Sequence, residues 1–200
     1  ASLSQTACPI LFQSPANDFH GRIDDLPSAV QALRTKDWRI TCAPHHNHQD
    51  TPEYEVAAQL WFDQHLQGTF RFPQAPQCAL QLRSANGVPS ATVEVDTSKP
   101  VLSVDVYYSQ SRPTDAGAKP ADDCKNRFWR HAKAARKGDV WQVEMPLISK
   151  DLPLRAYANV RYALSKPVTS AGYYYAIRSA DEFVLSSVLQ TVSSAQLQAA

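Results

Sequence analysis

The sequence predicts an α+β protein in which a partial parallel α/β segment is followed by an antiparallel β-sandwich. Residues 1 to about 70 alternate strand and helix patterns, which is typical of parallel strands joined by helices. A proline-rich stretch, FRFPQAPQ, interrupts this pattern at residues 70–77. After it, short β-rich runs separated by turn residues continue to about residue 192, as they do in sandwiches.

The first part is expected to fold as strand, helix, strand, helix. Strands are predicted at Cys8–Phe12 and Trp38–Ala43, and apolar residues at helical spacing predict an amphipathic helix over Asp25–Thr35. Two parallel strands need partners on both faces and on one edge. We therefore expect the isolated chain to expose apolar surface, and to form oligomers or to be poorly soluble.

The second helix has clear start and stop signals. Thr51 stands where an N-cap is expected, and Pro52 stands at the first helical position, where its missing N–H is harmless. Glu53 and Glu55 fall in the first turn, where the helix dipole favours carboxylates. Gly68 is expected to close the C-terminus, so the helix should lie between Pro52 and Gly68.

The second part is predicted to consist of strands, with turns at residues 86–87 and 98–100 and a polar loop at Ser111–Lys125. The expected strands are Ala79–Arg83, Ala91–Val95, Val101–Tyr107, Val140–Met145, Leu154–Tyr162 and Phe183–Val192. The aromatic residues expected in the core of the sandwich are Trp129, Trp141, Tyr157 and Tyr162. The alternative is that these rings stack against sugars on an exposed face.

Composition excludes several classes of partner. The formal net charge of +1 over 200 residues argues against a nucleic-acid partner, which would require a basic surface. No apolar run reaches the length of a membrane span, so no membrane is expected as partner.

The only methionine is Met145, so we expect that residue 1 is not a translation start and that the chain is processed or part of a longer protein.

The four cysteines form no C-x-x-C pair, which predicts neither a zinc site nor a thioredoxin-type site. Cys8 and Cys42 fall on predicted strands, where a buried free thiol is the expected state. Disulfides, to which Cys78 and Cys124 could contribute, remain open if the protein is exported.

Two polar loops follow the predicted strands and carry the candidate catalytic residues. SPANDFHG, residues 14–21, contains Asp18, and APHHNHQD, residues 43–50, contains three histidines. Because the carboxyl ends of parallel strands share one sheet edge, a carboxylate and an imidazole are expected to meet there. The alternatives are an Asx turn at Asp18, a solvated histidine loop, or a metal site built from His45, His46, His48 and Asp50, for which the H-H-x-H spacing is compact.

Three stretches, CPILFQSPANDFHG, RITCAPHHNHQD and EYEVAAQLWFDQHLQGTFRFP, together cover most of residues 1–73. They resemble the C-terminal end of bacterial α/β-hydrolases of the dienelactone hydrolase and acetyl xylan esterase type. That family has an Asn-Asp pair after the penultimate strand, P-x-x-x-H after the last strand and W-F-x-x-x-L-x-G at the end of the last helix. The resemblance implies that Asp18 is the acid and His48, four residues after Pro44, is the base of a Ser-Asp-His triad.

The second part, with VDVYYS, RFWR, GDVWQVEMP and LRAYANVRYAL, is similar to β-sandwich extensions of such secreted hydrolases. We divide the chain into an α/β segment (residues 1–70), a linker (71–77) and a sandwich (78–200) of the immunoglobulin or fibronectin type. The resemblance implies a secreted or periplasmic protein, with a carbohydrate ester as candidate substrate. Neither a cofactor nor a bound metal is expected.

The nucleophile of such a triad is not found in the sequence. None of the six glycines takes part in a G-x-S-x-G elbow. Because a triad acts as a unit, we expect the chain alone to be inactive and to be a fragment of a serine carboxyl-ester hydrolase. Its partner would be the missing N-terminal portion of the hydrolase, or a second copy bound through the open sheet. The alternative is a non-catalytic sandwich module that binds polysaccharide or a neighbouring domain.

Overall fold

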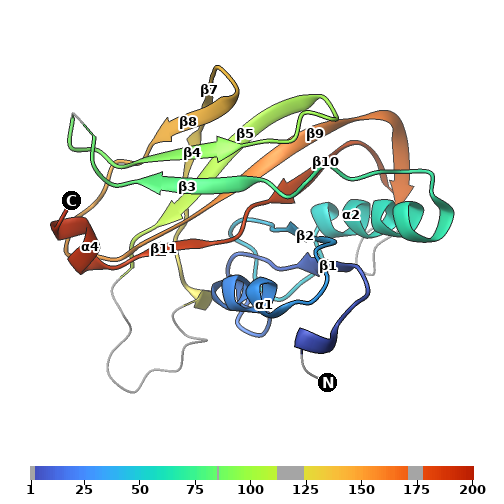
Figure 1. The fold of residues 1–200 in the computed structure, drawn as a ribbon, viewed down its shortest axis with the longest axis horizontal. Coiled ribbons are helices and arrows are strands. Elements are labelled where there is room, and N and C mark those ends of the chain that lie inside the picture. Colours follow the sequence, from blue (N-terminus) through green and yellow to red (C-terminus); the bar gives the residue numbers. More distant parts are fainter. Residues whose placement is uncertain (1–2, 85, 112–123, 171–177) are drawn as a thin grey trace.

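The computed structural model describes residues 3–84, 86–111, 124–170 and 178–200 of the chain (Figure 1). Over these residues the protein is a mixed α+β structure with three α-helices, and its sheets are mostly antiparallel. No helix in this part of the chain is long and apolar enough to cross a membrane. The coarse fold class predicted from the sequence is therefore confirmed.

The first part contains one parallel strand pair and two α-helices. Strand β1 (Ile10–Gln13) lies parallel to β2 (Trp38–Thr41), with Ile10 opposite Trp38. Between them come a 3-10 turn (η2, Ile23–Asp25) and helix α1 (Leu26–Ala32). The predicted order of strand, helix, strand, helix is thus present. The first strand begins two residues later than expected, which leaves Cys8 exposed instead of buried.

Helix α2 (Pro52–Phe62) begins at the predicted proline, with Thr51 as the predicted N-cap residue. The Thr51 side chain makes no capping hydrogen bond, and instead its backbone carbonyl accepts from the N–H groups of Tyr54 and Glu55. The chain then forms a π-helical turn (η3, Asp63–Gln67) and ends in Gly68, whose φ of 68° is left-handed. The predicted N-cap position and the predicted C-terminal glycine are both confirmed, and the Thr51 side chain takes no part in the cap.

The rest of the chain forms two antiparallel sheets, in the orders β3-β4-β8-β7 and β10-β9-β5-β6, with β11 also paired to β9. The strands are β3 (Gln77–Gln81), β4 (Ser90–Glu94), β5 (Val101–Ser109), β6 (Arg130–Lys133), β7 (Ala135–Lys137), β8 (Val140–Glu144), β9 (Leu154–Ser170), β10 (Arg178–Ser186) and β11 (Gln190–Val192). Short helical elements lie near the two ends, η1 (Leu3–Gln5) and α4 (Ser194–Gln198).

All the strand regions expected from the sequence contain strands, but strands β6 and β7 and helix α4 were not predicted. β6 and β7 are short and polar, so they show no apolar periodicity, and their pairing with β5 and β8 defines them. Helix α4 begins with a capping box formed by Ser193 and Gln196. Most of the expected loop at Ser111–Lys125 lies outside the described residues.

The run predicted as one strand at Phe183–Val192 is divided into β10 and β11. Both pair with β9, but Ser187 interrupts the ladder between them. The Ser187 N–H donates to the Ala158 carbonyl at 2.8 Å, and its hydroxyl accepts from the Ala158 N–H at 2.9 Å. A serine side chain therefore replaces one backbone pairing at this point.

Two apolar cores hold these layers together. The first core lies between the two antiparallel sheets and includes Leu60 and Trp61 of α2. The second core joins the α/β segment to the outer face of the five-stranded sheet. Its buried residues are Ala16, Ile23, Leu26, Ile40, Cys42, Trp129, Tyr157 and Leu189. The α/β segment is thus packed directly on the sandwich, below its strands in Figure 1.

The aromatic predictions are largely confirmed. Trp129, Tyr157 and Tyr162 are fully buried, whereas Trp141 is only half-buried. Tyr162 belongs to the first core, but Trp129 and Tyr157 belong to the second, between the sandwich and the α/β segment. Their burial therefore depends on the α/β segment as well as on the sandwich.

The stretch expected as a linker is packed against its neighbours. Phe72 is 3% exposed, and the Arg39 Nε–H donates to the Pro73 carbonyl at 2.5 Å.

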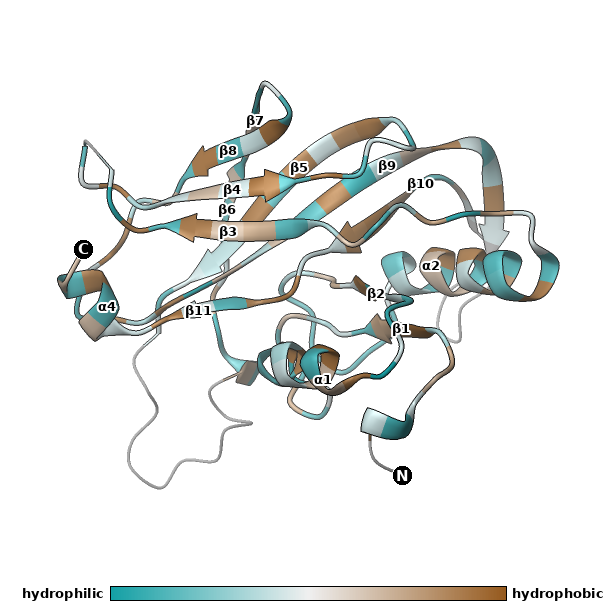
Figure 2. Ribbon diagram, viewed as in Figure 1, coloured by the Kyte–Doolittle hydropathy of each residue, from teal (hydrophilic) through white to brown (hydrophobic). Residues whose placement is uncertain are grey.

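Apolar residues continue through β1 and the end of β10 (Figure 2), and β2 contacts β10 directly. Consequently β2 is buried from residue 39 to 41, whereas β1 is only half-buried over residues 10–12.

Candidate functional site

The loops that follow β1 and β2 are joined by continued backbone pairing. We call residues 14–24 the acid loop and residues 43–50 the histidine loop. The Ser14 N–H donates to the Thr41 carbonyl at 3.1 Å, and the Ala16 N–H donates to Ala43 at 3.0 Å. The Asn17 N–H then donates to the His46 carbonyl at 3.0 Å. This extension beyond the strands brings the two loops side by side.

The two residues predicted as acid and base are in hydrogen-bond contact. His48 Nδ1 lies 2.9 Å from Asp18 Oδ2. The Asp18 side chain is 5% exposed, whereas the His48 side chain is 61% exposed. A carboxylate can only accept, so the imidazole carries its proton on Nδ1 and donates it. This tautomer leaves Nε2 with a lone pair available to take a proton.

The other carboxylate oxygen of Asp18 closes an Asx turn, because Oδ1 accepts the His20 N–H at 2.7 Å. Burial alone would raise the pKa of Asp18, but hydrogen bonds from His48 and from the backbone N–H groups of His20 and Gly21 outweigh it and lower this pKa. A Cβ at Gly21 would lie 3.3 Å from Oδ2, so glycine allows this close approach. Asp18 therefore combines the local turn with the contact to His48.

The other two histidines of the histidine loop have different neighbours. The His45 ring lies beside Tyr107 and Phe128, with centroid distances of 6.4 and 5.7 Å. His46 Nδ1 accepts from the Gln49 amide at 2.9 Å. Among the described residues, no group of three or more His, Cys, Asp or Glu side chains is arranged to hold a metal ion. The histidine loop thus directs one imidazole, that of His48, onto a carboxylate.

The Asp18–His48 pair borders a cavity of 360 Å³. The cavity is lined by Gln13, Pro15, Asp18, His48, Gln49, Asp50 and Tyr54. Burial raises the pKa of the Tyr54 hydroxyl, which therefore stays neutral. Among the described residues, the lining contains no serine, cysteine or threonine, so it combines a carboxylate and an imidazole without one of these nucleophiles.

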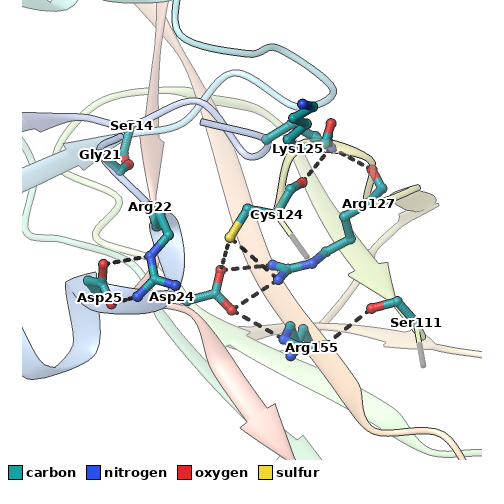
Figure 3. A network of polar contacts seen from close by, with 11 residues as sticks. Ser14, Gly21, Arg22, Asp24, Asp25, Ser111, Cys124, Lys125, Arg127 and Arg155 are labelled. Carbon is teal, nitrogen blue, oxygen red and sulfur yellow. Dashed lines mark hydrogen bonds and ion pairs between the residues drawn. The ribbon is translucent and has the colours of Figure 1, made fainter. Parts of the chain in front are cut away.

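Two residues, Asn17 and Asp24, tie the acid loop to the sandwich, a role that no sequence pattern predicted. The Asn17 amide donates to the carbonyls of Arg127 at 2.6 Å and Cys124 at 3.0 Å. Asp24 accepts from the Arg127 and Arg155 guanidiniums, and Figure 3 shows its carboxylate between them. These partners lie at least 100 residues away in the chain, beyond any local motif.

We expect Asp24→Ala to lower the free energy of unfolding by about 3 kcal/mol, since it removes the carboxylate that accepts from the buried Arg127 guanidinium. The Arg127 side chain is 0% exposed and the Asp24 side chain 22%. Asp25→Ala is the matched control, because the Asp25 carboxylate is 59% exposed in its pair with Arg22 and should contribute less than about 1 kcal/mol. Urea unfolding of both variants measures the difference, and equal losses would contradict the prediction.

The contribution of Asp24 to the free energy of unfolding should also depend on pH. Burial alone would raise the pKa of Asp24, but the hydrogen bonds and charge of Arg127, together with the Cys124 hydrogen bond and the Arg155 charge, lower this pKa below its ordinary value of 3.8. A lowered carboxyl pKa stabilises the folded state above the ordinary value, and this stabilisation is lost as pH falls through the folded-state pKa. The stability difference between wild type and Asp24→Ala should therefore be constant near neutral pH and shrink below about pH 4.

Comparison with known proteins does not assign the chain to a family. No protein-family model, curated protein or solved structure matches it.

Proposed function

We propose that this chain is part of a serine carboxyl-ester hydrolase of the α/β-hydrolase type and supplies the acid and the base of its triad. The observation that carries the proposal is the 2.9 Å contact between His48 Nδ1 and Asp18 Oδ2 beside an open cavity. Asp18 holds the imidazole in the tautomer that catalysis needs and stabilises the imidazolium that forms.

His48 Nε2 takes the proton of a serine hydroxyl as the oxygen attacks the ester carbonyl, and returns it to the leaving alcohol. Water then attacks the acyl-enzyme with the same imidazole as general base, which releases the acid and regenerates the serine. The serine comes from outside this chain, so the chain alone is inactive. The sequence resemblance adds a carbohydrate ester as substrate and secretion to the periplasm or medium.

The outer edge of β1 supports a partner that completes the site. Among the described residues, β1 pairs with β2 only. Because the N–H groups of Ile10 and Ser14 point toward β2, those of Leu11 and Gln13 point to the outer edge. A strand added there would end beside Gln13, which lines the cavity. The N-terminal hydrolase portion is the partner we propose for this edge, and a second copy of the chain is the alternative.

In this proposal the sandwich supports the α/β segment and does not act as a sugar-binding module. Trp129, Tyr157 and Tyr162 are at most 1% exposed, which disfavours sugar stacking on their rings. The second core and the anchors of the acid loop instead favour the sandwich as a support for the α/β segment. In this proposal the sandwich binds the α/β segment of the same chain and not a sugar.

The proposal is tested on the polypeptide expressed from the complete reading frame that encodes this chain. A fluorophosphonate probe, which modifies activated serines, should label that polypeptide but not the 200-residue chain alone. His48→Ala should abolish labelling of the complete polypeptide, whereas His46→Ala, in the same loop, should leave it unchanged. The absence of a labelled serine in the complete polypeptide would refute the proposal.

A further inference from the structure

One turn of the sandwich, residues 124–127, holds the acid loop near its beginning. We call it the anchor turn. The Asn17 amide nitrogen has two hydrogens, and its nearest acceptors are the carbonyls of Arg127 at 2.6 Å and Cys124 at 3.0 Å. The Lys125 carbonyl lies farther away, at 3.4 Å. Asn17 is 5% exposed, so these bonds are shielded from water.

The same anchor turn holds the other end of the acid loop through its side chains. The Arg127 guanidinium donates to both oxygens of Asp24, at 2.9 and 3.2 Å. The Cys124 thiol donates to Asp24 Oδ2 at 3.3 Å (Figure 3). The backbone carbonyls of the anchor turn thus bind Asn17, and its side chains bind Asp24. This two-point attachment fixes the loop against the sandwich.

Asp18 lies between the two attachment points, directly after Asn17. Besides its amide bonds to the anchor turn, Asn17 donates its backbone N–H to the His46 carbonyl. It therefore joins the acid loop, the histidine loop and the sandwich at one residue. Movement of Asn17 would move both partners of the Asp18–His48 contact, which depends on a separation of 2.9 Å.

We propose that Asn17 is a positioning residue, through which the sandwich sets the geometry of the Asp18–His48 pair. The catalytic meaning of this inference rests on the proposed function, but the positional effect concerns this chain alone. Without the two amide donors, the anchor turn no longer restrains residue 17. The Asp18 carboxylate then moves away from Nδ1, and the His48 imidazole loses the bond that selects its tautomer.

The test measures the tautomer of His48 in the 200-residue chain. The method is ¹⁵N NMR of labelled histidine, at an alkaline pH where the imidazole is neutral. Asn17→Leu keeps a similar volume and removes the donors. Gln110→Leu is the matched control, because the Gln110 amide also donates to two carbonyls, those of Ser149 at 2.8 Å and Leu152 at 3.0 Å, inside the sandwich. In the wild type and the control, His48 should carry its proton on Nδ1. In Asn17→Leu, the population of this Nδ1-protonated tautomer should fall by about half or more.

An unchanged His48 tautomer in Asn17→Leu would overturn the inference, as would an equal change in Gln110→Leu. If Asn17→Leu does not fold, Asn17→Ser retains one donor and should give a smaller shift in the same direction. An unchanged tautomer in folded Asn17→Ser would also overturn the inference. The readout requires no nucleophile, so it is independent of the proposed function. Failure of serine labelling with an intact tautomer effect would reject the hydrolase and leave the positioning role standing.

Discussion

Replacing His48 by alanine in the complete polypeptide is expected to lower kcat/KM for p-nitrophenyl acetate by roughly 10⁵-fold or more. The reason is that, in the proposed hydrolase, the general base is the His48 imidazole, which pairs with Asp18 through Nδ1, is 61% exposed and borders the cavity. Removal of a triad base leaves only binding and oxyanion stabilisation, which account for the residual rate.

Asp18→Asn should lower the same rate by roughly 10⁴-fold, since an amide NH₂ facing Nδ1 favours the wrong imidazole tautomer. His46→Ala serves as control, because the His46 ring contacts the Gln49 amide instead of a carboxylate, and its activity should match wild type. Thermal unfolding of each variant separates loss of activity from loss of folding. A folded His48→Ala enzyme that retains a tenth of wild-type activity would contradict the assignment.

Trp129→Ala is expected to lower the free energy of unfolding by about 4 kcal/mol, which is typical of a buried tryptophan in a packed core. Trp129 is 1% exposed and lies in the second core, where its ring packs edge-on against Tyr157 at a centroid distance of 5.1 Å. Because this core joins the α/β segment to the sandwich, both parts should lose stability together. Denaturant unfolding of Trp129→Ala, monitored by circular dichroism, should therefore show one transition, with its midpoint at a lower denaturant concentration than in the wild type.

Phe128→Ala provides the control for this prediction. Phe128 is the preceding residue and 72% exposed, so its truncation should change stability by less than about 0.5 kcal/mol. Two separate unfolding transitions, with one of them unaffected by Trp129→Ala, would show that the second core does not couple the two parts.

The sequence by itself determined the features that depend on short-range chemistry. Helix α2 begins at Pro52, and the π-helical turn η3 that continues it is closed by Gly68, as proline at the first helical position and glycine in the left-handed region require. The alternation of strand and helix predicted that the loops after β1 and β2 would share one edge. That prediction placed Asp18 near a histidine of the second loop, and the family resemblance selected His48. The two side chains lie 2.9 Å apart, and their catalytic role stays a proposal.

Only the tertiary structure decided how the two parts of the chain meet. Asn17 and Asp24 bind a turn at residues 124–127, and Trp129 and Tyr157 lie between the parts instead of inside the sandwich. The polar strands β6 and β7 likewise exist because β5 and β8 pair with them. Caps and periodicity act over a few residues, so they can be recognised locally. Contacts between residues more than 100 positions apart depend on which surfaces pack together, and no local pattern encodes that.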